Sequence, residues 1–117
     1  MKRVLIVEDE SILALIHRKY LEKLGCIISG TATSAEEAIK AALSDPPDLI
    51  IMDIRIEGDM DGVDVMTEIQ KSNNIPVIYV TGNSEPVVLE RANKTNMVGF
   101  LIKPLHIEDL KKIIDNL

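Results

Sequence analysis

Residues 48–53 read Asp-Leu-Ile-Ile-Met-Asp, which places four apolar residues between two carboxylates. An unbroken apolar run of this length predicts a strand that is buried on both faces, as in a parallel sheet covered by helices. Polar side chains at the carboxyl end of such a strand lie at the edge of the sheet where ligands bind. The stretch therefore predicts a buried strand that ends in a functional carboxylate, Asp53.

The rest of the chain alternates between short apolar runs and stretches with helical periodicity. The other runs rich in β-branched residues are 4–7, 27–33, 77–80 and 98–102. Strand and helix thus alternate five times along the sequence, which is typical of an α/β domain with a parallel sheet. Right-handed crossovers then favour a doubly wound, flavodoxin-like sheet with strand order 2-1-3-4-5 and five helices.

The five expected helices carry recognisable boundaries. In the first, an apolar face runs from Ile12 through Ile16 to Leu24, and Gly25 ends the helix. A capping-box pattern, Ser34 followed by Glu37, opens the second helix, residues 35–43. The remaining three are a helix with Val63, Met66 and Ile69, a helix over residues 85–94 opened by Ser84 and Pro86, and a helix with Ile107, Leu110, Ile113, Ile114 and Leu117.

Composition places the chain among ordinary globular proteins. Its 117 residues, 46% of them hydrophobic, fit one domain, residues 1–117. The formal charge of 13 − 19 = −6 argues against direct binding of nucleic acid, which depends on Lys and Arg. The single cysteine, Cys26, excludes an internal disulfide and is interpreted as a small apolar residue. The apolar run that follows Lys2 and Arg3 is too short for a signal peptide or membrane span, so we expect a cytoplasmic protein.

Polar residues follow the expected strands where each strand ends. Glu8 and Asp9 follow the first strand, Asp53 the third, Thr81 the fourth and Lys103 the fifth. Because the first and third strands are neighbours in the expected order, three carboxylates should converge on one crevice. A hydroxyl and an ammonium group should flank them.

This set of side chains is suited to phosphoryl transfer. Clustered carboxylates repel one another unless a proton or a cation lies among them, and oxygen ligands favour Mg²⁺. A carboxylate such as Asp53 can act as a nucleophile and form an aspartyl-phosphate. Lys103 and the hydroxyl of Thr81 can stabilise negative charge on a phosphoryl group, because this reaction depends mainly on positioning and charge neutralisation.

With these motifs in register, the sequence resembles the response-regulator receiver family over essentially the whole chain. The motifs are the pair Glu8-Asp9, Asp53 after its apolar run, the pair Asp61-Gly62 that opens the third helix, the pair Thr81-Gly82 and the pair Lys103-Pro104. The spacings also fit, with 44 residues from Asp9 to Asp53 and 22 from Thr81 to Lys103. Several motifs at strand ends are far more specific than one acidic pair.

The resemblance implies a role for each site residue. Asp53 would accept a phosphoryl group from the phosphohistidine of a sensor histidine kinase or phosphotransfer protein. The ligands of a Mg²⁺ cofactor would be Glu8, Asp9, Asp53 and the backbone carbonyl of Arg55. Lys103 would contact the phosphoryl group, through a peptide bond to Pro104 that is typically cis in the family.

The resemblance also implies a switch. Thr81 would move toward the phosphoryl group, and Phe100 would follow as the switch aromatic. The surface made by the fourth helix, the fifth strand and the last helix would then change and bind a downstream protein. A phosphorylation-dependent dimer stays open at this point.

One loop departs from the family pattern. The usual acceptor loop reads D-x-x-M-P-x-M-D-G, whereas residues 53–62 lack its Pro and are one residue longer. As a hypothesis, Arg55 and Asn83 tune how fast water removes the phosphoryl group. The acidic residues Glu57, Asp59 and Asp61 are interpreted as a solvated loop without calcium-loop spacing.

Three other functions compete with this interpretation. An aspartyl-phosphate phosphatase usually carries a second Asp where this chain has Arg55, so we do not expect turnover of an external substrate. A flavin protein of the same fold would place a phosphate where Glu8, Asp9 and Glu10 repel one. A receiver-like module used only for constitutive interaction usually loses one of the motif residues. His17 and His106 have no companion ligands and are interpreted as surface residues.

Overall fold

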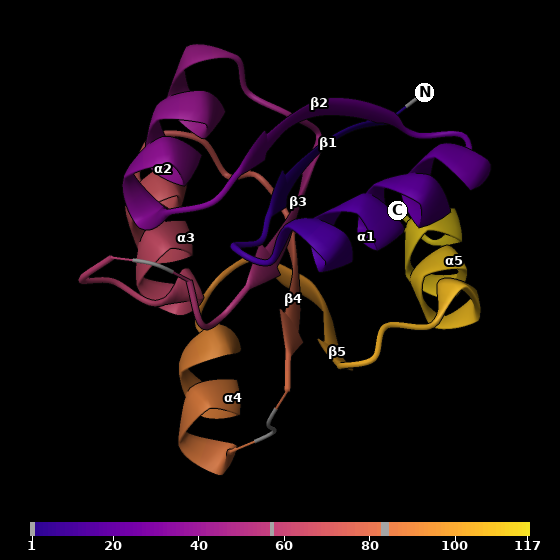
Figure 1. Ribbon diagram of the computed structural model, residues 1–117. Coiled ribbons are helices and arrows are strands. Elements are labelled where there is room, and N and C mark those ends of the chain that lie inside the picture. The colour runs from indigo at the N-terminus through magenta and orange to yellow at the C-terminus, as the bar shows by residue number, and fades with distance from the viewer. Residues whose placement is uncertain (1, 57, 83–84) are drawn as a thin grey trace.

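The computed structural model describes residues 2–56, 58–82 and 85–117. Five parallel strands form one sheet in the order β2-β1-β3-β4-β5 (Figure 1). The strands are β1 (Arg3–Val7), β2 (Ile27–Ala32), β3 (Leu49–Asp53), β4 (Val77–Thr81) and β5 (Met97–Ile102). The predicted doubly wound fold and strand order are confirmed.

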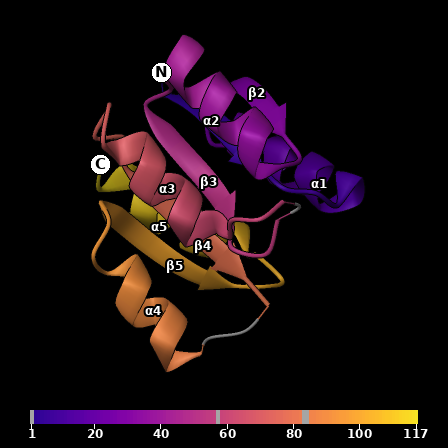
Figure 2. The same cartoon turned by 90° about the vertical axis from the view of Figure 1, so that its left-hand side faces the viewer.

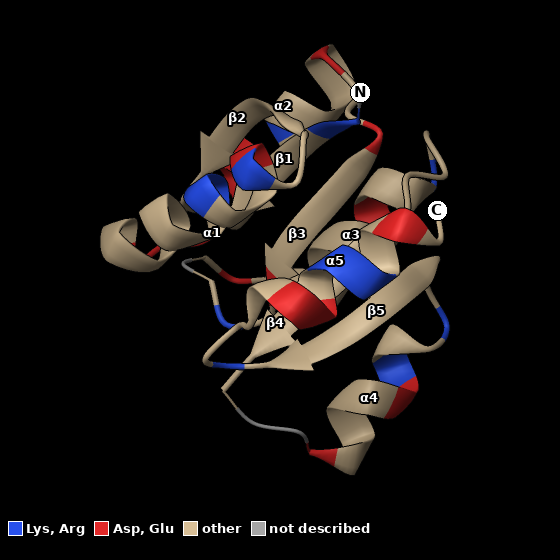
Figure 3. Cartoon of the chain, turned by 90° about the vertical axis from the view of Figure 1, so that its right-hand side faces the viewer, with Lys and Arg blue, Asp and Glu red and all other residues tan. Residues whose placement is uncertain are grey.

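Helices cover both faces of the sheet, as continuous apolar strands require. On one face lie α1 (Ser11–Lys23) and α5 (Ile107–Asp115), which stand in front of the sheet in Figure 3. On the other lie α2 (Ala35–Ser44), α3 (Gly62–Gln70) and α4 (Pro86–Ala92), which face the viewer in Figure 2. Within the described residues, no helix is long and apolar enough to cross a membrane.

The sheet divides the apolar core into two clusters. One joins the strands to α2, α3 and α4, through residues such as Ala38, Met66 and Ala92. The other joins them to α1 and α5, through residues such as Leu21 and Leu110. The β3 strand is fully buried, which confirms the strand predicted from residues 48–53.

The helix boundaries follow local chemistry. Ser34 accepts a hydrogen bond from the backbone N–H of Glu37 at 3.2 Å, as predicted, but the Glu37 carboxylate accepts from the N–H of Thr33 at 2.8 Å rather than from Ser34. Gly25 follows the last turn of α1 with a φ of 87°, a left-handed conformation that glycine adopts without strain. The α4 helix begins at Pro86, and the predicted opening residue Ser84 lies outside the described residues.

Two predictions for α1 are wrong. Ile12 and Ile16, which the sequence places on the buried face, are 72% and 37% exposed. His17, interpreted as a surface residue, is 3% exposed, and burial lowers its pKa to about 4, with the charge of Lys103 acting in the same direction. The physical reason is that α1 meets the sheet through a face rotated toward His17 and Leu21. His106 is exposed as expected, and Cys26 is buried as a small apolar residue.

Candidate functional site

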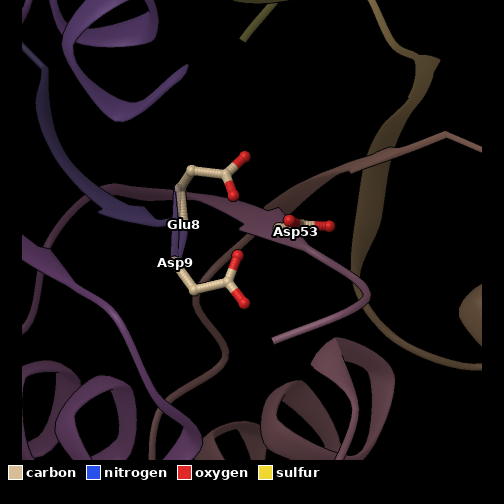
Figure 4. A group of neighbouring side chains, drawn as sticks. All are labelled: Glu8, Asp9 and Asp53. Atoms are coloured by element: carbon tan, nitrogen blue, oxygen red, sulfur yellow. The ribbon is translucent and has the colours of Figure 1, made fainter. Parts of the chain in front are cut away.

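Two neighbouring strands bring the three predicted carboxylates together. Val7 pairs with Met52 in the parallel register of β1 and β3, so the residues that follow, Glu8 and Asp53, lie side by side. Figure 4 shows the carboxylates of Glu8, Asp9 and Asp53 pointing toward one another. One oxygen from each lies within 4.8 Å of the others. Glu8 and Asp53 are 2% and 5% exposed, whereas Asp9 is exposed.

Lys103 reaches into the same site from the end of β5. Its Nζ atom lies 2.9 Å from Oδ2 of Asp53 and 3.0 Å from Oε1 of Glu8. The backbone of Lys103 is held beside the end of β4, because its N–H donates to the carbonyl of Thr81 at 2.8 Å. The Lys103–Pro104 peptide bond is cis, as the resemblance implied. The lysine therefore lies between two buried carboxylates.

Burial and charge set the protonation of these groups. Burial raises the pKa of Glu8 to about 7, and the neighbouring Asp53 acts in the same direction, while Lys103 opposes the shift. Burial also disfavours the charged form of Lys103, but its contacts with Asp53 and Glu8 outweigh burial and raise the pKa of Lys103 above its ordinary value. The three carboxylates can therefore carry more negative charge than the single positive charge of Lys103 balances.

One buried oxygen shows that a cation fits this cluster. Oε1 of Glu8 is buried and accepts no hydrogen bond from any residue that the structure describes, although it lies 3.0 Å from Nζ of Lys103. The contact is thus an ion pair without hydrogen-bond geometry, which leaves the oxygen available to a further positive partner. Glu8, Asp9 and Asp53 offer only oxygen atoms, the ligands that Mg²⁺ prefers. The residues fit a magnesium ion.

The acceptor carboxylate is itself held in place. Oδ1 of Asp53 accepts a hydrogen bond from the backbone N–H of Arg55 at 3.1 Å, while Oδ2 faces Lys103. The backbone of Arg55 therefore lies beside the site, and its own carbonyl is the one predicted above as a magnesium ligand. The side chain of Arg55 is exposed, and its partner in the hydrolysis hypothesis, Asn83, lies outside the described residues.

The two predicted switch residues lie on adjacent strands. Thr81 is the last residue of β4 and is 3% exposed. Phe100 lies in β5, is partly buried, and packs against Tyr79 with ring centroids 6.4 Å apart and an interplanar angle of 55°. Their movement on phosphorylation stays a prediction.

The structure confirms that Asp61 and Gly62 open the third helix, but Asp61 is not simply a solvated loop residue. Asp61 is the N-cap of α3, where it forms a capping box with Asp64, and both carboxylates contact Arg91 of α4. The Asp61-x-x-Asp64 spacing is a capping pattern that the sequence does contain. Nothing in the sequence indicates the partner Arg91, because it lies 30 residues further along the chain. Asp59 is exposed as expected, and Glu57 lies outside the described residues.

Gly62 was predicted only as part of the Asp61-Gly62 motif, but in the structure it also has a packing role. A Cβ atom at this position would lie 2.4 Å from the carbonyl oxygen of Asp53 and 2.8 Å from Cγ of Met52. Its N–H donates to the carbonyl of Ile54 at 2.7 Å. The first turn of α3 therefore packs directly on the backbone of the acceptor strand, and only glycine leaves the required space.

Comparison with known proteins agrees with this geometry. The response regulator receiver domain family model matches residues 4–115. The transcriptional regulatory protein PdtaR of Mycobacterium tuberculosis is 34% identical over 114 residues, which cover 97% of this chain and 55% of PdtaR. The chemotaxis protein CheY of Thermotoga maritima is 30% identical over 117 residues, which cover 96% of this chain and 97% of CheY. The chain thus spans about half the length of PdtaR and nearly all of CheY.

Solved structures show the same architecture. The signal receiver domain of a modulated diguanylate cyclase from Desulfovibrio desulfuricans matches with a TM-score of 0.90 at 33% identity, over 99% of this chain and 92% of that chain. A two-component response regulator from Clostridium difficile matches with a TM-score of 0.90 at 28% identity, over 99% and 94%. Family model, sequence relatives and fold agree, and the chain therefore belongs to the response regulator receiver domain family of two-component systems.

Proposed function

We propose that this chain accepts a phosphoryl group on Asp53 from the phosphohistidine of a sensor histidine kinase or phosphotransfer protein. The observation that carries the proposal is the position of the Asp53 carboxylate, buried between Glu8 and Lys103 at the end of β3. Receiver domains as a family interact with histidine kinases and downstream effectors and bind Mg²⁺ at an acidic pocket. Residues 1–117 act as one receiver domain in this proposal, and the compartment is the cytoplasm.

In the proposed step, an Asp53 oxygen forms a bond to phosphorus while the bond from phosphorus to the imidazole nitrogen breaks. The electron pair of that bond leaves with the imidazole. Lys103 already lies 2.9 Å from Oδ2 of Asp53, so its charge is in place to stabilise the phosphoryl oxygens. The hydroxyl of Thr81 is proposed as a donor to another phosphoryl oxygen, which draws Phe100 and β5 into the response.

The acidic cluster accounts for the metal dependence that we expect. Glu8, Asp9, Asp53 and the backbone carbonyl of Arg55 would hold Mg²⁺ in this chain. When bound, Mg²⁺ neutralises charge on the transferred group and on the carboxylates. Glu8 supplies a buried oxygen that makes no hydrogen bond within the described part of the chain, and the N–H of Arg55 keeps the Asp53 carboxylate oriented.

The proposed output surface consists of α4, β5 and α5. It carries exposed apolar side chains suited to a protein partner, namely Val87, which is 68% exposed, and Ile102, which is 44% exposed. A second phosphorylated copy of the chain is one partner that this surface could bind. With a formal charge of −6, direct binding of nucleic acid is not part of the proposal.

The test uses Mg²⁺ and acetyl phosphate as a small phosphodonor, with intact mass as the readout. We expect the mass of one added phosphoryl group in the wild type, none after chelation of the metal, and none in Asp53→Asn. Asp59→Asn is the matched control, because Asp59 is an exposed acidic residue of the same loop. Phosphate that persists in Asp53→Asn, or a wild type that takes up none, would overturn the proposal.

Two further measurements complete the test. Amide hydrogen exchange should change in α4 and around Phe100 when the chain is phosphorylated, because a short helix with one exposed flank opens easily. Equal exchange in both states would rule out a switch at this surface. We propose that the chain turns over no external substrate, so steady release of product from a phosphomonoester would contradict that part.

A further inference from the structure

An arginine on α4 forms hydrogen bonds to the start of α3. Nη1 of Arg91 donates to Oδ2 of Asp61 at 2.8 Å, and Nη2 donates to Oδ1 of Asp61 at 3.2 Å and to Oδ1 of Asp64 at 2.8 Å. Planar, forked contacts of this kind define both distance and orientation. In Figure 2, α3 and α4 lie next to each other on the same side of the sheet.

This contact differs from the other ion pairs on the helices. Lys71 with Glu68, and Lys111 with Asp115, join residues three and four apart along one helix or its cap, and their side chains are between 48% and 66% exposed. Such pairs contribute little to stability. The Arg91 contacts join two helices across 27 and 30 residues of sequence, so they restrain tertiary structure.

The arginine also holds two like charges together. Asp61 accepts from the N–H of Asp64 at 2.9 Å, and Asp64 accepts from the N–H of Asp61 at 3.2 Å. This capping box brings two carboxylates to the same turn, where they repel each other. The guanidinium of Arg91 contacts both, so the geometry of the turn depends on a residue of α4.

The same turn rests on the phosphoacceptor strand. Gly62 directly follows Asp61, its N–H donates to the carbonyl of Ile54 at 2.7 Å, and its Cα lies too close to the carbonyl of Asp53 for any Cβ. A shift of the turn therefore displaces the backbone that carries Asp53 and the N–H of Arg55. Close-packed contacts of this kind transmit displacement rather than absorb it.

We propose that Arg91 is a positioning residue that couples α4 to the magnesium and phosphoryl site, by fixing the Asp61–Asp64 turn against the backbone of Asp53. The inference rests on the proposed function, because it assumes that the site binds Mg²⁺. It adds a route from the site to α4 that runs through α3, separate from the proposed movement of Thr81 and Phe100. Because coupling is reciprocal, metal binding should restrain α4, and release of α4 should weaken metal binding.

Three variants separate this role from general stability. Arg91→Gln removes the fork, and Arg91→Lys keeps the charge but contacts only as a point donor. Asp61→Asn removes the negative charge and one of the two acceptor oxygens that Arg91 contacts on Asp61, while keeping a good N-cap side chain, so it weakens the contact without removing the cap. Lys71→Gln is the matched control, since it removes one positive charge from an exposed pair at the other end of α3.

The readouts are the Mg²⁺ concentration at half-saturation, by calorimetry, and amide exchange in α4 with and without Mg²⁺. Arg91→Gln and Asp61→Asn should each raise that concentration about fivefold, Arg91→Lys less, and the double variant no further than either single one. In both of the first variants, α4 should exchange faster and should no longer respond to Mg²⁺. Urea unfolding of each variant shows whether the fold is intact.

The outcomes are distinguishable. If the wild type binds Mg²⁺ while Arg91→Gln and Asp61→Asn behave like Lys71→Gln in both readouts, the coupling is overturned and the proposed function stands. If the wild type binds no Mg²⁺, the magnesium site fails and the coupling fails with it. Should Arg91→Gln unfold, Asp61→Asn alone decides between these results.

Discussion

Oη of Tyr79 lies 2.8 Å from Oγ1 of Thr95, so a buried residue of β4 holds the chain just after α4. Oγ1 of Thr95 donates in turn to the carbonyl of Ala92 at 2.6 Å. Because a threonine hydroxyl has one hydrogen, the phenol is the donor in the first bond. Burial raises the pKa of Tyr79 to about 12, so the phenol stays protonated. The C-terminal end of α4 is therefore anchored, while Val87 near its start is exposed.

Tyr79→Phe should release this anchor without disturbing the core. The ring stays in place, and the loss of one hydrogen bond should lower the free energy of unfolding by about 1 kcal/mol. Amide exchange from Ala92 to Met97 should increase more than elsewhere in the chain. Tyr20→Phe, the same chemical change on the opposite side of the sheet, is the control. Equal effects of the two variants on exchange near Thr95 would show that the hydroxyl anchors nothing.

Lys103→Met should slow phosphorylation of Asp53 by acetyl phosphate about 100-fold, the usual cost of removing one donor that stabilises developing charge. The methionine keeps an unbranched side chain, one atom shorter than that of lysine, but leaves Glu8 and Asp53 without their cation. Rates come from intact mass against time at saturating Mg²⁺. Lys111→Met, an exposed lysine of α5, should react at the wild-type rate. A rate for Lys103→Met within a factor of two of the control would remove Lys103 from the proposed step.

Gly62→Ala should destabilise the fold by about 2–3 kcal/mol, because the new methyl group meets backbone atoms that cannot rotate away. The closest of these is the carbonyl oxygen of Asp53, at 2.4 Å from the added Cβ. Gly30→Ala is the control, since its Cβ would make only an ordinary contact of 3.7 Å with Leu5. Urea unfolding measures both changes. A neutral result for Gly62→Ala would mean that α3 and the acceptor strand separate easily.

His17 should make the protein sensitive to acid. Burial lowers the folded-state pKa of His17 to about 4, below its ordinary value of 6.5. The unfolded chain therefore takes up the proton first, so this contribution to stability is present above pH 6.5 and is lost as the pH falls toward 4. The loss should reach about 3.5 kcal/mol, from a shift of about 2.5 pKa units at about 1.4 kcal/mol each.

The measurement is urea unfolding of the wild type and His17→Gln at several pH values between 7.5 and 4.5. As the pH falls, the free energy of unfolding should decrease more for the wild type than for His17→Gln. This difference in slope is expected even if the glutamine destabilises the protein at every pH. His106→Gln is the control, because His106 is exposed. Parallel curves for wild type and His17→Gln would show that His17 does not titrate in this range.

Arg55→Ala should change the lifetime of the phosphoryl group on Asp53. Its N–H donates to Oδ1 of Asp53, and its exposed side chain extends from a backbone that lies at the site. The measurement is loss of the phosphoryl mass after the phosphodonor is removed. Arg18→Ala, an exposed arginine of α1, is the control. If Arg55→Ala and Asn83→Ala both lose the phosphoryl group at the wild-type rate, the hypothesis that these residues tune hydrolysis is wrong.

Much of the fold could be predicted because its signals are local. Continuous apolar strands such as 49–53 are buried wherever they occur in a parallel sheet, and the caps at Ser34 and Gly25 depend on neighbouring residues only. The orientation of α1 could not be predicted in the same way. Its apolar residues lie around much of the helix, with Ile12 and Leu21 on opposite sides, and packing against the sheet decides which side is buried.

The carboxylate cluster was predictable for a topological reason. Parallel strands end at one edge, so strand order alone brings Glu8, Asp9 and Asp53 together. The contacts around the cluster depend on side chains that meet only in the folded chain. Arg91 reaches Asp61 across 30 residues of sequence, and the space beside Gly62 exists only because α3 packs on β3. No local pattern carries either contact.

Among the residues that the structure describes, the two apolar clusters on opposite faces of the sheet share strands but no helix. Substitutions that adapt α4 to a new target therefore repack only one side of the protein, while the side chains beneath α1 and α5 keep their partners. Changes on the two sides should be nearly additive in stability, since the strands between them separate the sites of substitution. Selection can thus alter the recognition of one partner without disturbing the opposite layer of the domain.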